Sequence, residues 1–175
     1  MNAENAEEAQ RAQSGGGGLG SRTNELPDGL NRLSERVIGC AIEVHRQLGP
    51  GLLERIYEDA MVYELHAAGL LVDRQVPVPV RYKDVELHGQ RLDIIVERQI
   101  VLELKAVEKI PEVYVSQLVS YLRISDLPLG LLINFNVPIL TRGIHRRINS
   151  AALEGVTAAF PSASSASPLR TLRSD

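Results

Sequence analysis

The hydrophobic pattern of this chain changes its period at Val72, and that change sets the order of elements that the fold must contain. Before Val72, apolar residues recur at spacings of three and four, which is typical of one face of an α-helix. The residues of this face are Leu33, Val37, Ala41, Val44 and Leu48. We expect a first helix with Asn31 or Ser34 as its N-cap that ends at the "GPG" of residues 49–51, and a second helix over about residues 52–68.

From Val72 onward apolar and polar residues alternate, as in "VDRQVPVPVRY", and this period indicates β-strands. The predicted elements are strands over residues 72–82, 84–97 and 100–107, a helix over 111–123, a buried strand over 129–135 and a short terminal helix over 142–148. Pro77 and Pro79 cannot donate to a strand ladder, so the first strand should lie at a sheet edge or beside a bulge. The pattern predicts an α/β fold of order ααβββαβ, with a mixed four-stranded sheet flanked by helices.

Composition limits the fold to one domain. The 175 residues are 44% hydrophobic, which is enough for one core of ordinary size. Residues 1–27 are polar and end in the linker-like "SGGGGLGS", and residues 151–175 are rich in Ser, Ala and Pro. Such segments bury too little apolar surface to offset the entropy of ordering them, so we expect disordered tails on either side of a domain over residues 28–150.

The composition also excludes several classes of protein. A single cysteine, Cys40, excludes an internal disulfide and a paired-thiol zinc site, and it favours a reducing, cytoplasmic environment. No run approaches the roughly 20 apolar residues of a membrane span. Acidic and basic residues nearly balance over residues 28–150 and there is no Trp. Contact with DNA or RNA is therefore expected to be local and to the backbone only.

Three charged residues interrupt the apolar strands of "RLDIIVERQIVLELKAV". Glu103 and Lys105 are two apart and share a face of their strand. If the three residues after Val96 form a hairpin loop, Val96 pairs with Ile100, and the same register places Asp93 opposite Glu103. Adjacent carboxylates need a cation between them, and their oxygens suit Mg²⁺ or Mn²⁺, with the lysine placed to orient or deprotonate a water. The alternative interpretation is a solvent-facing ion pair of Glu103 and Lys105.

Two of the predicted helices carry polar residues on faces that should be partly buried. Glu54 precedes Tyr57 by three residues on the second helix, and a carboxylate on that stripe needs a partner. Gln117 and Tyr121 are four apart on the third helix and also share a face. The alternative for the second pair is an ordinary helix surface.

These residues together resemble a known family. "GLLERIY", from Gly51 to Tyr57, matches the signature of the GxxExxY protein family, and the resemblance runs from about Leu33 to Ile148. It includes the stretches "EVHRQLGPG", "LDIIVE", "LELKAV", "SQLVSYL" and "GLLINF". That family is similar to the PD-(D/E)XK nuclease superfamily, whose core is a mixed four-stranded sheet flanked by helices.

The resemblance implies a role for each polar residue singled out above. Asp93 and Glu103 would bind the metal, Lys105 would be the catalytic lysine, and Glu54 would be the acidic residue of the leading helix. The Q-x-x-x-Y element, Gln117 and Tyr121, resembles that of the RecB-like branch and would hold substrate phosphate or the lysine.

The chain departs from the family pattern at two positions. Tyr114 stands where relatives often have His, three residues before the glutamine of the Q-x-x-x-Y element, and Leu92 stands where Pro often precedes the first metal-binding aspartate.

We therefore expect a nuclease-like protein that uses Mg²⁺ or Mn²⁺ to hydrolyse phosphodiester bonds of DNA or RNA. The Leu104 carbonyl, and Glu54 through a water, would complete the ligands of the ion. Arg146 and Arg147 are expected to contact the phosphate backbone. Two alternatives stay open: a catalytically silent nuclease fold used for binding or assembly, and a subunit whose protein partner, or a second copy of the chain, supplies substrate binding.

Overall fold

The computed structural model describes residues 26–153, and these form three layers with a β-sheet in the middle. The elements in chain order are α2 Asp28–Leu48, α3 Glu54–Ala67, β1 Val72–Tyr82, β2 Val85–Val96, β3 Ile100–Lys105, α4 Glu112–Ser125, β4 Leu129–Asn134, the 3₁₀ helix η1 Leu140–Gly143 and β5 Ile144–Ile148. No helix within this part of the chain has the length and apolar character needed to cross a bilayer.

The sheet is mixed and its strands follow the chain order, β1-β2-β3-β4-β5. Only β3 and β4 are parallel, and α4 is the crossover between them; every other neighbouring pair is antiparallel. A parallel pair needs such a crossover, which explains why a helix separates these two strands in the sequence. The predicted mixed α/β fold flanked by helices is confirmed.

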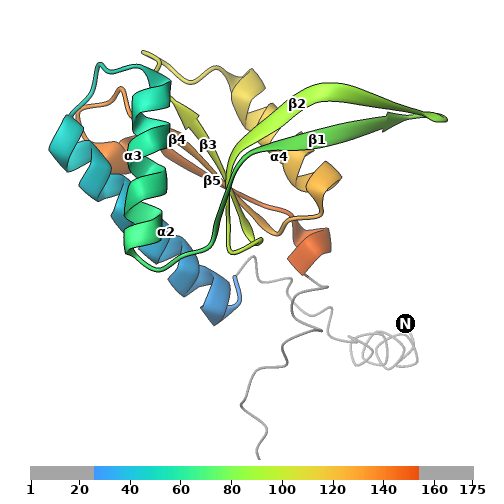
Figure 1. The fold of residues 1–175 in the computed structure, drawn as a ribbon, viewed down its shortest axis with the longest axis horizontal. Helices are drawn as coiled ribbons and strands as arrows, with labels where there is room; N and C mark the ends of the chain where they lie inside the picture. The colour runs from blue at the N-terminus through green and yellow to red at the C-terminus, as the bar shows by residue number, and fades with distance from the viewer. Residues whose placement is uncertain (1–25, 154–175) are drawn as a thin grey trace, which may run out of the picture.

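Two apolar clusters hold the layers together, one on each face of the sheet. The first joins α2 and α3 to the strands through residues such as Val37, Met61 and Leu102, all fully buried. The second joins α4 to the opposite face through Leu118, Leu122 and other buried residues. Figure 1 shows α2 and α3 on one side of the sheet and α4 on the other.

The β2–β3 hairpin has the register that the sequence predicts. Val96 pairs with Ile100, and the pairing continues to Ile94 and Leu102. Glu97 and Arg98 both have positive φ angles, +51° and +54°, and the Gln99 N–H donates to the Val96 carbonyl at 2.9 Å. Two successive left-handed residues give a turn whose twist matches that of antiparallel strands, so the hairpin forms although the turn contains no glycine.

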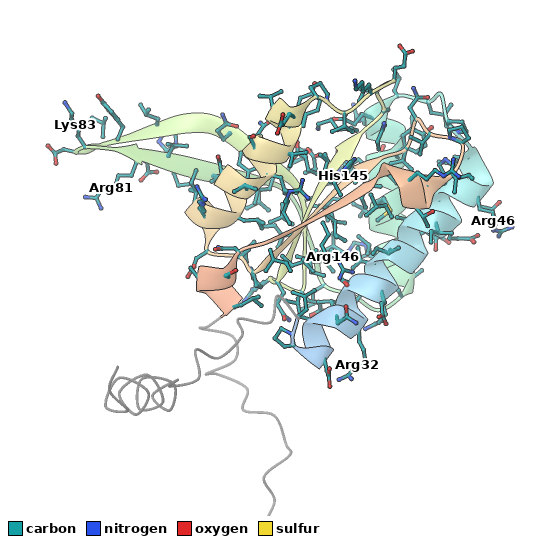
Figure 2. The ribbon with its side chains drawn as sticks, turned by 180° about the vertical axis from the view of Figure 1, so that it is seen from behind. Arg32, Arg46, Arg81, Lys83, His145 and Arg146 are labelled. Atoms are coloured by element: carbon teal, nitrogen blue, oxygen red, sulfur yellow. The ribbon has the colours of Figure 1, made fainter. Side chains whose placement is uncertain are left out.

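Strand β1 lies at the edge of the sheet, as its prolines predict. Pro77 pairs with Arg91 and Pro79 lies at a bulge, where the register shifts between Val78 and Val80. Beyond this bulge β1 and β2 pair only with each other and project from the sheet as a two-stranded ribbon. Arg81 and Lys83 mark its tip in Figure 2.

The sheet has five strands and not the four predicted, because the segment expected to be a short terminal helix forms β5. Ile144 and Ile148 are four apart, a spacing that places two residues on one face in a helix and in a strand alike. Both pack against the α2 and α3 cluster. The spacing therefore fits a helix and a strand equally well. The segment forms a strand because it pairs with the otherwise free edge of β4, from Leu129 to Ile133.

The predicted start of the first helix is also wrong. Helix α2 begins at Asp28, after Pro27, and neither Asn31 nor Ser34 is its N-cap. Ser34 is buried one turn inside the helix and its hydroxyl donates to the Asn31 carbonyl at 2.9 Å. At the other end, residues 150–153 are helical and lie at the predicted limit of the domain, and the predicted division into domain and tails stays a prediction. The rest of both predicted tails, residues 1–25 and 154–175, lies outside the described residues.

The contact between α4 and β4 depends on Gly130 and gives a test of the packing. A Cβ atom at Gly130 would lie 2.8 Å from Leu118 Cδ1 and 2.9 Å from its Cγ, and Leu118 is fully buried. We expect Gly130→Ala to lower the free energy of unfolding by about 1–3 kcal/mol, measured by urea denaturation. Gly39→Ala is the matched control, because Gly39 lies on the exposed face of α2 with nothing within 4 Å, and there alanine should stabilise the helix by up to about 1 kcal/mol. Equal effects of the two substitutions would contradict the packing argument.

Candidate active site

Asp93 lies where the backbone pairing of β2 is interrupted on both sides. The β2–β3 pairing stops at Ile94, and on the other side β1 pairs with Ile94 and Leu92 but skips the residue between them. Gln75, the residue of β1 across from Asp93 in this register, has a positive φ of +50°. The Asp93 carboxylate accepts the Leu104 N–H at 2.8 Å, so a side chain replaces a ladder hydrogen bond at this point.

Glu103 and Lys105 meet Asp93 from β3. Lys105 Nζ donates to Glu103 Oε1 at 2.9 Å and to the Leu104 carbonyl at 2.7 Å, and it lies 4.0 Å from Asp93 Oδ2. Glu103 is 5% exposed, and its second oxygen, Oε2, is buried without a hydrogen-bond partner within residues 26–153. The pair is not the solvent-facing ion pair of the alternative interpretation.

Glu54 joins the cluster from the first turn of α3, with its Oε1 3.6 Å from Lys105 Nζ. Tyr57 determines where this turn begins. Its hydroxyl donates to the Gly49 carbonyl at 2.7 Å and accepts the Leu52 N–H at 3.1 Å, and its buried ring stacks on Phe135 with centroids 4.5 Å apart. The tyrosine of the "GLLERIY" motif thus anchors the loop that precedes α3, and the glutamate reaches the cluster.

Burial raises the pKa of every carboxyl group in the cluster, and nearby carboxylates raise it further. Desolvation raises the pKa of Asp93 and of Glu54, and desolvation followed by the charge of Asp93 raises the pKa of Glu103 to about 7. Burial by itself lowers the pKa of Lys105, but Glu103, Asp93 and Glu54 outweigh that effect and raise it. Lys105 therefore stays charged and compensates three acids that it cannot fully neutralise.

Helix α4 borders this cluster, and the hydrogen bonds of Gln117 and Tyr121 lead to β2 and not to the charged groups. Gln117 Nε2 donates to the Tyr121 hydroxyl, which donates to Gln90 Oε1 at 2.6 Å on β2. Burial raises the pKa of the Tyr121 hydroxyl, and the charges of Glu103 and Asp93 raise it further. Tyr114, at the position where relatives often have His, has its ring centroid 5.4 Å from Lys105 Nζ.

The structure does not bring Arg146 and Arg147 to the cluster. Both are on β5, which is separated from β3 by β4. Arg146 donates to Ser34 Oγ at 2.9 Å on α2, and Figure 2 shows it alongside that helix. Arg147 donates to the Arg146 carbonyl at 2.7 Å. Their expected contact with a phosphate backbone stays a prediction, and because both arginines lie on the edge strand β5, that contact would be made away from the charged cluster.

An open cleft of about 720 Å³ gives access to the cluster and contains residues that the sequence did not point to. Its lining is Leu53, Glu54, Arg55, Glu58, Arg74, Gln75 and Asp93. Glu58 is buried, and its Oε1 accepts from Arg74 Nε at 2.6 Å and from Gln75 Nε2 at 2.9 Å. Glu58 follows Glu54 by four residues, so helical spacing could have identified it, whereas its partners on β1 could be found only from the tertiary structure.

The donor atoms of the cluster suit a hard divalent cation, although they are not preassembled around one. Within residues 26–153 no three His, Cys, Asp or Glu side chains form a ready-made metal site, because Lys105 Nζ occupies the position between the carboxylates. The unpartnered Glu103 Oε2 is costly in a buried position, and carboxylate and carbonyl oxygens are the ligands that Mg²⁺ and Mn²⁺ prefer. Asp93, Glu103 and the Leu104 carbonyl therefore fit such an ion.

Comparison with known proteins identifies the family. A family model of the PD-(D/E)XK nuclease superfamily matches residues 31–147, well over half of the chain, and the chain therefore belongs to this superfamily. No curated protein and no solved structure matches it. The matched residues include all four members of the charged cluster.

The raised pKa of Glu103 predicts a specific pH dependence of stability. A carboxyl group with a higher pKa in the folded state binds its proton more tightly there, so folding becomes less favourable as the pH rises from the usual 4.5 to about 7. Over this range the free energy of unfolding of the wild type should fall relative to that of Glu103→Gln by up to about 3 kcal/mol. Urea denaturation of both proteins in EDTA at several pH values measures this difference. A difference that stays constant from pH 4 to pH 8 would show that the carboxyl group titrates normally.

Proposed function

We propose that this protein is a divalent-metal-dependent nuclease that hydrolyses phosphodiester bonds of DNA or RNA. One observation carries the proposal: Lys105 Nζ lies within 2.9 Å, 3.6 Å and 4.0 Å of carboxylates from β3, α3 and β2, and one buried oxygen among them lacks a partner within the described residues. Buried ionic groups that serve only stability normally satisfy their own oxygens. A site that leaves one open is suited to a further cation.

In this proposal Asp93, Glu103 and the Leu104 carbonyl hold Mg²⁺ or Mn²⁺, and Glu54 contributes through a water. When bound, the ion lowers the pKa of a coordinated water and neutralises charge on the phosphate. Lys105 then has a second task. Its ammonium orients the attacking water and donates hydrogen bonds to the oxygen on which negative charge develops. The Tyr114 ring and the Leu104 carbonyl keep the ammonium beside the metal-binding oxygens.

We further assign the chain to the GxxExxY family within the superfamily, on the match of Gly51, Glu54 and Tyr57. Gln117 and Tyr121 are proposed to act as in the RecB-like branch, by holding substrate phosphate next to the cluster. The chain of hydrogen bonds from Gln117 through Tyr121 to Gln90 supports this, because it fixes the helix face that borders β2.

The first test is the substitution Asp93→Asn. Asparagine keeps an oxygen that accepts the Leu104 N–H, so the strands stay joined while one charge is removed. We expect calorimetric titration to show saturable binding of Mg²⁺ or Mn²⁺ to the wild type and none to the variant. Cleavage of labelled single- and double-stranded DNA and RNA should fall by at least about 100-fold in the variant.

Asp73→Asn is the control, since Asp73 is exposed on β1 and its side chain makes no hydrogen bond or ion pair within residues 26–153. It should leave binding and cleavage unchanged. A wild type that binds no metal in the millimolar range and cuts no strand would refute the proposal. The alternative of a catalytically silent binding or assembly module would then be favoured.

Lys105→Met separates the role of the lysine from that of the metal ligands. The ammonium and the ion need the same oxygens, because Lys105 Nζ already binds Glu103 and the Leu104 carbonyl. We expect the variant to bind Mn²⁺ at least as tightly as the wild type by calorimetry, yet to lose cleavage. Lys109→Met, at an exposed residue in the loop before α4, is the control and should retain both. Loss of Mn²⁺ binding in Lys105→Met would mean that the lysine only holds the site together.

A further inference from the structure

A substrate can reach the charged cluster from one side more easily than from the others. The side chains of Glu103 and Lys105 are 7% and 11% exposed, whereas those of Asp93 and Glu54 are 17% and 44% exposed. Asp93 and Glu54 are also the two members of the cluster that line the cleft between the first turn of α3 and the bend of β1 at Gln75. A phosphodiester that approaches the cluster therefore enters through this cleft.

The cleft contains two arginines, and only one of them is free to bind an anion. Arg74 is paired twice, with Glu58 Oε1 and with Asp59 Oδ1, both at 2.6 Å. Arg55 is exposed, and its side chain makes no hydrogen bond or ion pair within residues 26–153. A phosphate that comes near the carboxylates of this cleft meets a negative potential, and the Arg55 guanidinium is the unpaired positive charge at its wall.

We infer that Arg55 binds a backbone phosphate of the nucleic-acid strand next to the bond that is cut. This inference rests on the proposed nuclease function and identifies the entry path of its substrate. Arg55 lines the same cleft as Glu54 and Asp93, so a phosphate bound there by Arg55 lies close to the cluster. The Tyr57 contacts that fix the start of α3 position both residues.

Arginine is well suited to this task because its planar guanidinium binds two phosphate oxygens at once and is always charged. Such a contact reads the backbone and carries no base preference, so it serves DNA and RNA alike. It also adds to the role expected of Arg146 and Arg147, which lie on β5 away from the cleft.

The test compares Arg55→Ala with Arg32→Ala in the full chain. Arg32 is also exposed on a helix without a side-chain hydrogen bond or ion pair in the described residues, and Figure 2 shows it on α2. Affinity is measured by fluorescence anisotropy with a fluorescein-labelled 20-nucleotide single strand, in Ca²⁺ in place of Mg²⁺, at several KCl concentrations. Cleavage of the same strand in Mg²⁺ gives KM and kcat.

We expect Arg55→Ala to weaken binding roughly tenfold and to reduce the slope of log Kd against log salt by about 0.7, the value for one phosphate contact on a single strand. KM should rise by a similar factor while kcat stays within about twofold of the wild type, and Arg55→Lys should recover the salt slope. Arg32→Ala should change none of these.

Affinity and salt slope of Arg55→Ala equal to those of Arg32→Ala would overturn the inference while leaving the nuclease proposal intact, provided that the wild type cuts the strand and Asp93→Asn does not. The two proposals therefore fail in distinguishable ways. If the wild type binds the strand through Arg55 but cuts nothing, the phosphate contact of Arg55 is upheld, whereas its place next to a cut bond fails together with the catalytic proposal.

Discussion

The hydrogen bond from the Leu104 N–H to the Asp93 carboxylate holds two strands together at the point where their backbone pairing stops. A charged side chain here does what a main-chain carbonyl does in the rest of the ladder. This hydrogen bond places the Asp93 carboxylate within the sheet, where water is scarce, and burial raises its pKa. The positions of Glu103 and Lys105 follow, because both are on β3 on either side of the residue whose N–H is taken.

The cluster that results holds more negative than positive charge in a partly buried position. Three carboxylates surround one ammonium, and each acid has a pKa raised by its surroundings. A protein selected only for stability would gain by replacing such groups with apolar residues of similar volume. The neighbouring contacts between Glu58, Arg74 and Gln75 are different in kind, since there one acid meets two donors and is satisfied. The Glu58 carboxylate is thus matched by donors from β1, whereas the carboxylates around Lys105 outnumber the positive charge beside them.

Local sequence periodicity was sufficient to predict the elements that are defined by their neighbours in the chain. A three-residue loop after Val96 gave the β2–β3 register, and that register gave the approach of Asp93 to Glu103. The mixed sheet followed from the helix between β3 and β4. Periodicity failed for Ile144 and Ile148, where helix and strand place the same residues on one face and only the open edge of β4 distinguishes them.

The parts of the site that were missed depend on contacts between distant segments. No local pattern shows that Arg74 on β1 donates a hydrogen bond to Glu58 on α3, or that Arg146 on β5 donates one to Ser34 on α2. The role of Tyr57 could not be predicted for the same reason. Its ring stacks on Phe135 and its hydroxyl donates to the Gly49 carbonyl, and these two residues are far apart in the sequence. Sequence reasoning therefore found the charged residues of the cluster more readily than the residues that hold them in place.

The prolines of β1 have a consequence for how these molecules behave at high concentration. Pro77 and Pro79 pair with or lie beside β2 without an N–H to offer, so their nitrogens face outward from the sheet. A strand from another molecule that approached this edge would meet two positions with no donor, and a continuous intermolecular ladder could not form there. The exposed β1 edge of the sheet can thus resist edge-to-edge aggregation at these two positions.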